Sequence, residues 1–214
     1  MPDFIARYIG LAAFLVFAII FKFVITRTGR SQRESKDKLF EDERSANFSR
    51  VQAIPEGIMY TPDVSKLPVR EYTDEEKKLR LLQERALAAA SKPMLRLDPP
   101  MTNIEIKRAF GATNLEIMTT REENYELYIR ALSNWAGELI SRDNYEAAEI
   151  ILKICIEMNA LFFLPYSLLC DVYEKTGNKA ATQTLRDYIN KTEIIRNNEI
   201  LFKKISDYIR VKLS

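Results

Sequence analysis

The feature that most constrains the fold is a self-similarity in the C-terminal half of the chain, at a lag of about 34 residues, which is a period typical of stacked helix-turn-helix units. The first unit contains Trp135, Ala136, Leu139, Asn144, Tyr145, Ala148, Leu152 and Cys155, and the second contains Leu169, Cys170, Tyr173, Asn178, Lys179, Thr182, Arg186 and Ile189. The first helix of the unit recurs well and the second only loosely, so we expect two helical hairpins of unequal regularity.

From about residue 125 to residue 190 the chain resembles the tetratricopeptide repeat (TPR) family. The residues that fall where this family places its packing residues are Trp135, Ala136, Tyr145, Ala148, Tyr173 and, at the turn, Gly177. The chain departs from the family pattern at Ala160, where a proline would close the first unit, and at Lys179, Thr182 and Arg186, where the second unit should be apolar or small. The resemblance implies a binding scaffold that receives a peptide or helix of a protein partner on its concave side, and no catalyst.

In such an array the first helix of each pair lines the binding surface. The polar positions on these helices that lie off the packing stripe are Asn124, Arg130, Ser133, Asn134, Ser167 and Asp171. We take these six as candidate partner-binding residues. The alternative for each is an ordinary hydrated side chain, because polar residues on helix surfaces are usually solvated.

An apolar segment near the N-terminus predicts a membrane anchor. Residues 8–25 contain one charge, at Lys22, and a bilayer core is crossed by about 20 apolar residues. We therefore expect a single transmembrane helix within residues 1–25 and lipid contact through residues 8–25. A cleaved signal peptide, or a buried or interfacial helix, is the alternative. The basic residues after the segment, among them Arg27 and Arg30, predict a single-pass protein whose C-terminal domain lies on the cytoplasmic side.

Composition divides the rest of the chain. Residues 26–72 are charged and contain prolines, which is typical of a tether, although their apolar residues also fit a strip docked on another surface. Residues 73–111 read as a helical lead-in, and residues 112–214 as the TPR-like domain with a capping helix at its C-terminal end. Capping boxes at Thr73, Thr102 and Thr120, each followed three residues later by glutamate, predict helix starts. No segment reads as strand, so the predicted class is all-α: one N-terminal transmembrane helix, a linker and a TPR-like helical-hairpin array.

Several classes of chemistry lack the residues that they need. The chain has no histidine, which removes the commonest catalytic base and transition-metal ligand. Its two cysteines, Cys155 and Cys170, are too few for a zinc site, and no glycine-rich phosphate-binding motif is present. We therefore expect no catalytic residues, no metal and no cofactor. A net charge of +2 argues against nucleic acid as a partner.

These observations favour a membrane-anchored adaptor, or scaffold, that binds a protein partner through its helical domain. The alternative is a structural accessory subunit of a larger membrane protein complex, in which the proline-containing segment and the last helix would be buried against neighbouring subunits. An enzyme is the least favoured hypothesis, because only clustered carboxylates in predicted first helical turns remain for acid-base chemistry.

Overall fold

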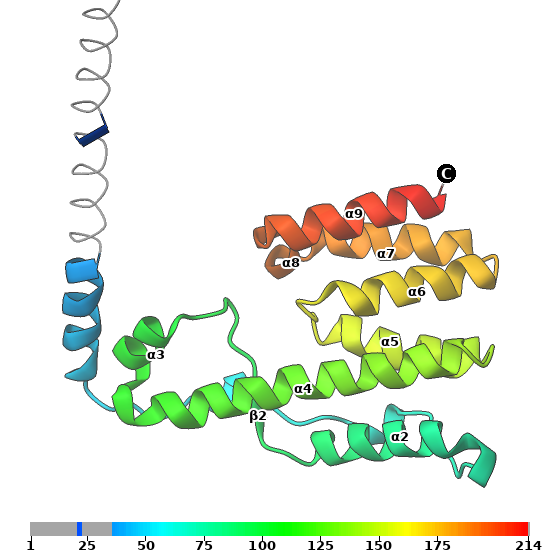
Figure 1. The fold of residues 1–214 in the computed structure, drawn as a ribbon, viewed down its shortest axis with the longest axis horizontal. Helices are drawn as coiled ribbons and strands as arrows, with labels where there is room; N and C mark the ends of the chain where they lie inside the picture. Colours follow the sequence, from blue (N-terminus) through cyan, green and yellow to red (C-terminus); the bar gives the residue numbers. More distant parts are fainter. Residues whose placement is uncertain (1–20, 23–35, 214) are drawn as a thin grey trace, which may run out of the picture. The chain divides into compact units, whose positions relative to one another are not determined.

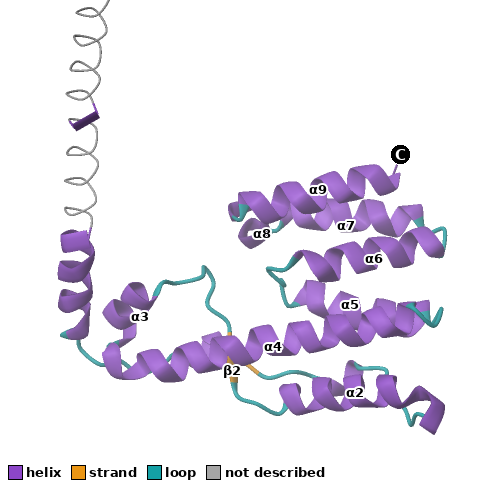
Figure 2. Ribbon diagram, in the orientation of Figure 1, coloured by secondary structure: helices purple, strands orange, loops and turns teal. Residues whose placement is uncertain are grey.

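The computed structural model describes residues 21–22 and 36–213, and these are mostly helical (Figures 1 and 2). The all-α class predicted from the sequence is confirmed for this part of the chain. The chain divides into two compact units: the first includes residues 102–113 and the described residues up to 52, and the second comprises residues 53–101 and 114–214. The second unit contains both hairpins that the sequence predicts.

The predicted membrane anchor requires a correction. Among residues 21–22 and 36–213, no helix combines the length and the apolar character needed to cross a membrane. The longest described helix, α4 (Leu115–Ile140), carries charged side chains along its length, which are costly inside a bilayer. The prediction of a fold with a transmembrane helix, and of a single-pass protein with a cytoplasmic C-terminal domain, is therefore not supported. The predicted span itself lies outside the described residues, except for residues 21 and 22.

The first unit contains a helix over residues 36–47 and α3 (Asn103–Phe110). Two ion pairs join these helices, from Lys107 to Glu43 at 3.1 Å and from Arg108 to Asp42 at 2.6 Å. The predicted capping box at the start of α3 is present, and Gly111 ends this helix with a φ of 89°. A Cβ atom at Gly111 would lie 2.8 Å from the Cα of Val51, so the position requires glycine.

The second unit is a succession of packed helices (Figure 1). Besides α4, they are α2 (Lys77–Ala90), α5 (Tyr145–Glu157), α6 (Phe163–Lys175), α7 (Lys179–Lys191), α8 (Glu193–Asn197) and α9 (Glu199–Leu213). Helix α2 packs against α4, α4 against α5, and α5 against α6, while α9 packs against both α6 and α7. The buried side chains of these helices form one hydrophobic core, with Trp135 and Tyr166 among its largest members.

Two predicted helix boundaries are wrong. Helix α4 begins at Leu115 rather than at Thr120, because the short turn over Ala112–Asn114 already leads into it, so the third capping box lies inside the helix. The last predicted helix is divided into α8 and α9. Asn198 stands at the break, where its side chain accepts a hydrogen bond from the backbone N–H of Leu201 at 3.1 Å and caps α9.

A two-stranded antiparallel sheet, which the sequence did not predict, joins distant segments. Strand β1 (Met59–Tyr60) pairs with β2 (Met94–Leu95), so that Met59 lies opposite Leu95 and Tyr60 opposite Met94. Two residues per strand are too few to show alternation in a sequence. The pairing holds part of the proline-containing segment against the residues that follow α2.

The same segment makes further contacts within the second unit. Leu67 and Tyr72 belong to the hydrophobic core. The side-chain amide of Gln83 on α2 pairs with the backbone of Arg70, accepting from its N–H at 3.0 Å and donating to its carbonyl at 2.9 Å. The indole N–H of Trp135 donates to the hydroxyl of Tyr72 at 3.2 Å. Residues 67–72 therefore form a strip docked on α2 and α4.

The turn between α4 and α5 has a defined geometry. The backbone N–H of Asn144 donates to the carbonyl of Leu139 at 2.9 Å, and the Asn144 side chain accepts from the N–H of Ala147 at 3.3 Å. Asp143, which precedes the cap, has a φ of 58°. This left-handed residue reverses the chain, and the asparagine satisfies a free N–H at the start of α5.

The turn between α6 and α7 has the same geometry. The N–H of Asn178 donates to the carbonyl of Tyr173 at 2.8 Å, and its side chain accepts from the N–H of Ala181 at 3.1 Å. Gly177 takes the left-handed position with a φ of 68°. The two hairpins therefore reverse direction in the same way.

Candidate functional site

Two of the six predicted contact residues are buried. Ser133 is 1% exposed, and its hydroxyl donates to the carbonyl of Ile129 at 2.7 Å. Ser167 is 8% exposed and donates to the carbonyl of Leu164 at 3.0 Å. Each side chain is thus bonded to its own helix.

Two others are engaged by neighbouring segments. The side-chain amide of Asn124 donates to the carbonyl of Pro93 at 3.1 Å. Asp171 accepts from the hydroxyl of Tyr208 at 2.7 Å and lies 2.8 Å from the ammonium of Lys212, so α9 occupies this position.

The remaining two predicted residues are exposed on α4. Asn134 faces solvent. The guanidinium of Arg130 lies 4.5 Å from the ring centre of Phe162 and 3.4 Å from the carboxylate of Glu126. Both Phe162 and Glu126 line a hollow next to α4, so Arg130 is the predicted residue that stands beside the candidate site.

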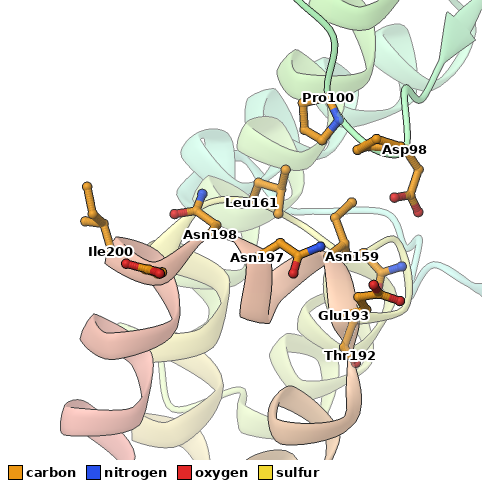
Figure 3. A pocket seen from close by; sticks show the side chains of 12 residues that line it. Asp98, Pro100, Asn159, Leu161, Thr192, Glu193, Asn197, Asn198 and Ile200 are labelled. Atoms are coloured by element: carbon orange, nitrogen blue, oxygen red, sulfur yellow. The ribbon is translucent and has the colours of Figure 1, made fainter.

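A cleft of about 910 Å³ lies among the connecting segments of the second unit (Figure 3). Three connecting segments form it: residues 98–100 after β2, the link between α5 and α6, and the junction of α7, α8 and α9. The lining residues are Asp98, Pro99, Pro100, Asn159, Leu161, Thr192, Glu193, Ile194, Asn197, Asn198, Glu199 and Ile200. The volume lies in the upper part of the range of about 300–1,000 Å³ that ligand pockets occupy.

A smaller hollow of about 100 Å³ continues the cleft toward α4. It shares with the cleft the residues Pro100, Asn159, Leu161 and Ile194. Its other lining residues are Arg96, Leu97, Glu122, Tyr125, Glu126, Ile129 and Phe162. We call the two hollows together the junction cleft.

Apolar and amide side chains both line the junction cleft. Ile200 is 84% exposed at one end, and Leu161 and Ile194 are partly buried. The amide oxygen of Asn159 accepts from the hydroxyl of Tyr188 at 2.6 Å. The oxygen of Asn198 is also used, in capping α9, and the amide N–H groups of both residues donate to no residue in the described ranges, so that they can donate to a ligand. The side chain of Asn197 makes no hydrogen bond to any residue that the structure describes, and it faces the same cleft (Figure 3).

The charge of the junction cleft is negative. Of its five carboxylates, Asp98 is paired with Arg96 at 2.8 Å, and Glu126 approaches Arg130. The others, Glu122, Glu193 and Glu199, form no ion pair with a residue in the described ranges. Partial burial raises the pKa of Glu122, and the charge of Glu126 raises it further.

The acidic residues at the junction of α7, α8 and α9 also have a structural role. Glu193 and Glu199 occupy the first turns of α8 and α9, where a carboxylate is stabilised by the positive end of the helix dipole. That role fixes them at the edge of the cleft without neutralising their charge.

A hydrogen-bond network holds the link between α5 and α6 in place. The hydroxyl of Tyr125 and the guanidinium of Arg96 both donate to the carbonyl of Met158, the latter at 3.3 Å. The hydroxyl of Tyr166 donates to the carbonyl of Ala160 at 2.9 Å. The hydroxyl of Tyr125 is protonated at neutral pH, and burial raises its pKa further, to about 12. The cleft wall is thus formed before any ligand arrives.

Within residues 21–22 and 36–213, no group of three or more histidine, cysteine, aspartate or glutamate side chains is placed to hold a metal ion. Cys155 and Cys170 are both buried and not disulfide-bonded. Burial raises the pKa of each thiol to about 12, so neither is an activated nucleophile in the folded state.

No protein-family model, no curated protein and no solved structure matches this chain. Its function is therefore inferred from the geometry of the site.

The junction cleft could not be read from the sequence because its residues come from segments far apart in the chain. In the sequence, Ile194 is one of several apolar residues at helical spacing, which predicts that it packs inward on a terminal helix. Pro99 and Pro100 predict only that a helix ends there. The pair Asn197 and Asn198 inside an otherwise periodic segment was the available signal, because adjacent asparagines favour a break over a continuous helix.

Proposed function

We propose that this protein is a protein-interaction module that binds a segment of its partner in the junction cleft. The observation that carries the proposal is the combination of a preformed cleft, apolar side chains that line it, and side-chain amide N–H groups that donate to no described residue. Exposed Ile200 and partly buried Leu161 offer apolar contact, while Asn159, Asn197 and Asn198 offer hydrogen bonds.

A TPR-like arrangement of the hairpins belongs to the same proposal. Its support is the recurrence of one turn geometry in both hairpins, with Asn144 and Asn178 in equivalent caps. Arrays of helical hairpins present extended surfaces on which protein segments dock. The partner surface proposed here differs from the first-helix surface expected from the sequence, because Ser133, Ser167 and Asp171 are engaged internally.

A permanent subunit of a larger assembly is the second candidate. It is favoured by the apolar side chains of Leu39, Phe40, Phe48 and Val51 in the first unit, which are between 58% and 82% exposed. A group of large exposed apolar residues is typical of a surface that a partner covers. In that case the first unit would be buried in a stable complex.

The test is site-specific photo-cross-linking in cells that express the protein. A benzophenone side chain replaces Ile200 in the cleft or, as a control, Leu81 on α2, which is 44% exposed. We expect a discrete protein adduct from position 200 that is absent from position 81 and lost when Asn197→Trp fills the cleft. The same adducts from both positions, or none from position 200, would refute binding in the cleft.

A further inference from the structure

Resting on the proposed function, we infer that the segment bound in the junction cleft is extended and carries lysine or arginine residues among apolar ones. Three properties of the cleft define this chemistry: its negative charge, its apolar side chains and the amide N–H groups that donate to no described residue.

The charge selects a basic partner. Glu122, Glu193 and Glu199 have no ion-pair partner within the described residues, and the cationic side chain that lines the cleft, Arg96, is held by Asp98 and the carbonyl of Met158. Glu122 is partly buried beside Glu126. A cation from a partner would relieve this like-charge contact, whereas an acidic segment would add to it.

The amides select an extended backbone. The amide N–H groups of Asn159 and Asn198 can donate to the backbone of a ligand only if its C=O groups are free, and the amide of Asn197 can also accept from a free backbone N–H. Within a helix these groups are bonded to one another, while an extended strand presents them to its neighbours. Three amides around one cleft therefore fit an extended segment better than a helix.

The apolar residues of the cleft indicate that basic and apolar side chains alternate in the bound segment. Leu161 and Ile194 line both hollows, the one that contains Glu193 and Glu199 and the one that contains Glu122 and Glu126, while Ile200 stands at the open end of the first. Since successive side chains of an extended segment point to opposite sides, one row can contact these residues while the other reaches the glutamates. A partner with basic and apolar residues in alternation meets both requirements.

The experiment uses the full chain and a fluorescent probe peptide in which lysine alternates with leucine, with binding followed by fluorescence anisotropy at low and moderate salt. A second peptide has glutamate in place of each lysine. The test variant is E122Q/E193Q/E199Q, and the control variant is E75Q/E84Q/E146Q, which removes three exposed carboxylates elsewhere in the second unit. Circular dichroism checks that both variants remain folded.

We expect the lysine peptide to bind, the test variant to weaken binding about tenfold at low salt, and the control variant to leave it unchanged. Added salt should weaken wild-type binding and reduce the difference between the variants. Equal loss in both variants would show general charge attraction and overturn the inference.

Failure of this inference is distinguishable from failure of the proposed function. If the photo-cross-link at position 200 forms but the lysine peptide does not bind, or if the glutamate peptide binds better, the cleft binds a protein of another chemistry. If neither the cross-link nor any peptide binding is found, the proposed function fails as well.

Discussion

The two hairpins of the second unit share one turn but differ in their second helices. Helix α5 buries Ala148, Ile151, Leu152, Cys155 and Ile156, whereas α7 buries Thr182, Leu185 and Ile189. Leu152 is fully buried, and its counterpart in the second hairpin, Arg186, is exposed. The turn recurs because a local cap specifies it, while the packing diverges because each second helix meets different neighbours.

The segments after the two hairpins also correspond. Asn159 and Ala160, which follow α5, correspond to Glu193 and Ile194, which follow α7, at the same lag of about 34 residues. Both junctions line the cleft. Equivalent ends of the two hairpins thus both line the cleft, and they supply an amide from Asn159 and a carboxylate from Glu193.

Trp135→Ala should have the largest effect on stability. The side chain is fully buried and donates to Tyr72, so its removal leaves a large cavity and an unsatisfied hydroxyl. We expect a loss of about 3–5 kcal/mol in the free energy of unfolding. Urea denaturation followed by circular dichroism measures it. Leu169→Ala, at the equivalent place in the second hairpin, should lower the free energy of unfolding by less. An equal or greater loss would contradict the expectation that the first hairpin contributes more to the core than the second.

Leu152→Ala and Arg186→Ala test the same position in both second helices. Leu152 is fully buried, so its truncation should cost about 2–5 kcal/mol. Arg186 is exposed, and its truncation should change the free energy of unfolding by no more than about 0.5 kcal/mol. Thermal denaturation of the two variants side by side suffices. A large cost for Arg186→Ala would mean that α7 packs in the same way as α5.

Asn144→Ala and Asn178→Ala should behave alike. Each removes a side-chain acceptor from the first turn of a helix, which costs about 1 kcal/mol. Urea midpoints of the two variants should therefore agree within error, and serine at either position should recover most of the loss. Unequal losses in the free energy of unfolding would show that the two caps have the same geometry but stabilise the protein by different amounts.

Thiol labelling should show the smallest difference between the hairpins. Because burial raises the pKa of Cys155 and Cys170 to about 12, both thiols are protonated in the folded state at pH 8 and react only after local opening. Their folded-state pKa values exceed the unfolded ones, so their contribution to stability is complete below about pH 8.5 and is lost as the pH rises toward 12. Because both side chains are fully buried, we expect the two thiols to react at similar rates, measured by mass spectrometry. Much faster labelling of either thiol would show that its hairpin opens more readily than the other.

Local signals in the sequence predicted much of the fold. The capping boxes at Thr73 and Thr102 and the turns at Asn144 and Asn178 are present, because each depends on bonds within a few residues. The box at Thr120 failed since an earlier turn starts α4 first. The two-residue strands could not be predicted, because their pairing brings together segments about 35 residues apart.

The candidate site was less predictable than the fold. Asp171 was expected to face a partner, but Lys212 and Tyr208 of α9 engage it, and no local pattern announces such a contact. The side chains of Ser133 and Ser167 bond to carbonyls one turn earlier in their own helices, a use that sequence alone does not separate from solvation. A cleft assembled from three loops depends on tertiary packing.

The most direct test of binding in the junction cleft is a nuclear magnetic resonance titration of the isotope-labelled full chain with the lysine-leucine peptide. We predict that the amide signals of residues 122–126, 159–161 and 193–200 shift together, including the side-chain amides of Asn159, Asn197 and Asn198. Shifts gathered instead around Lys153, Tyr173 and Leu185, which line a separate hollow beside α7, would contradict it, as would no shifts at all.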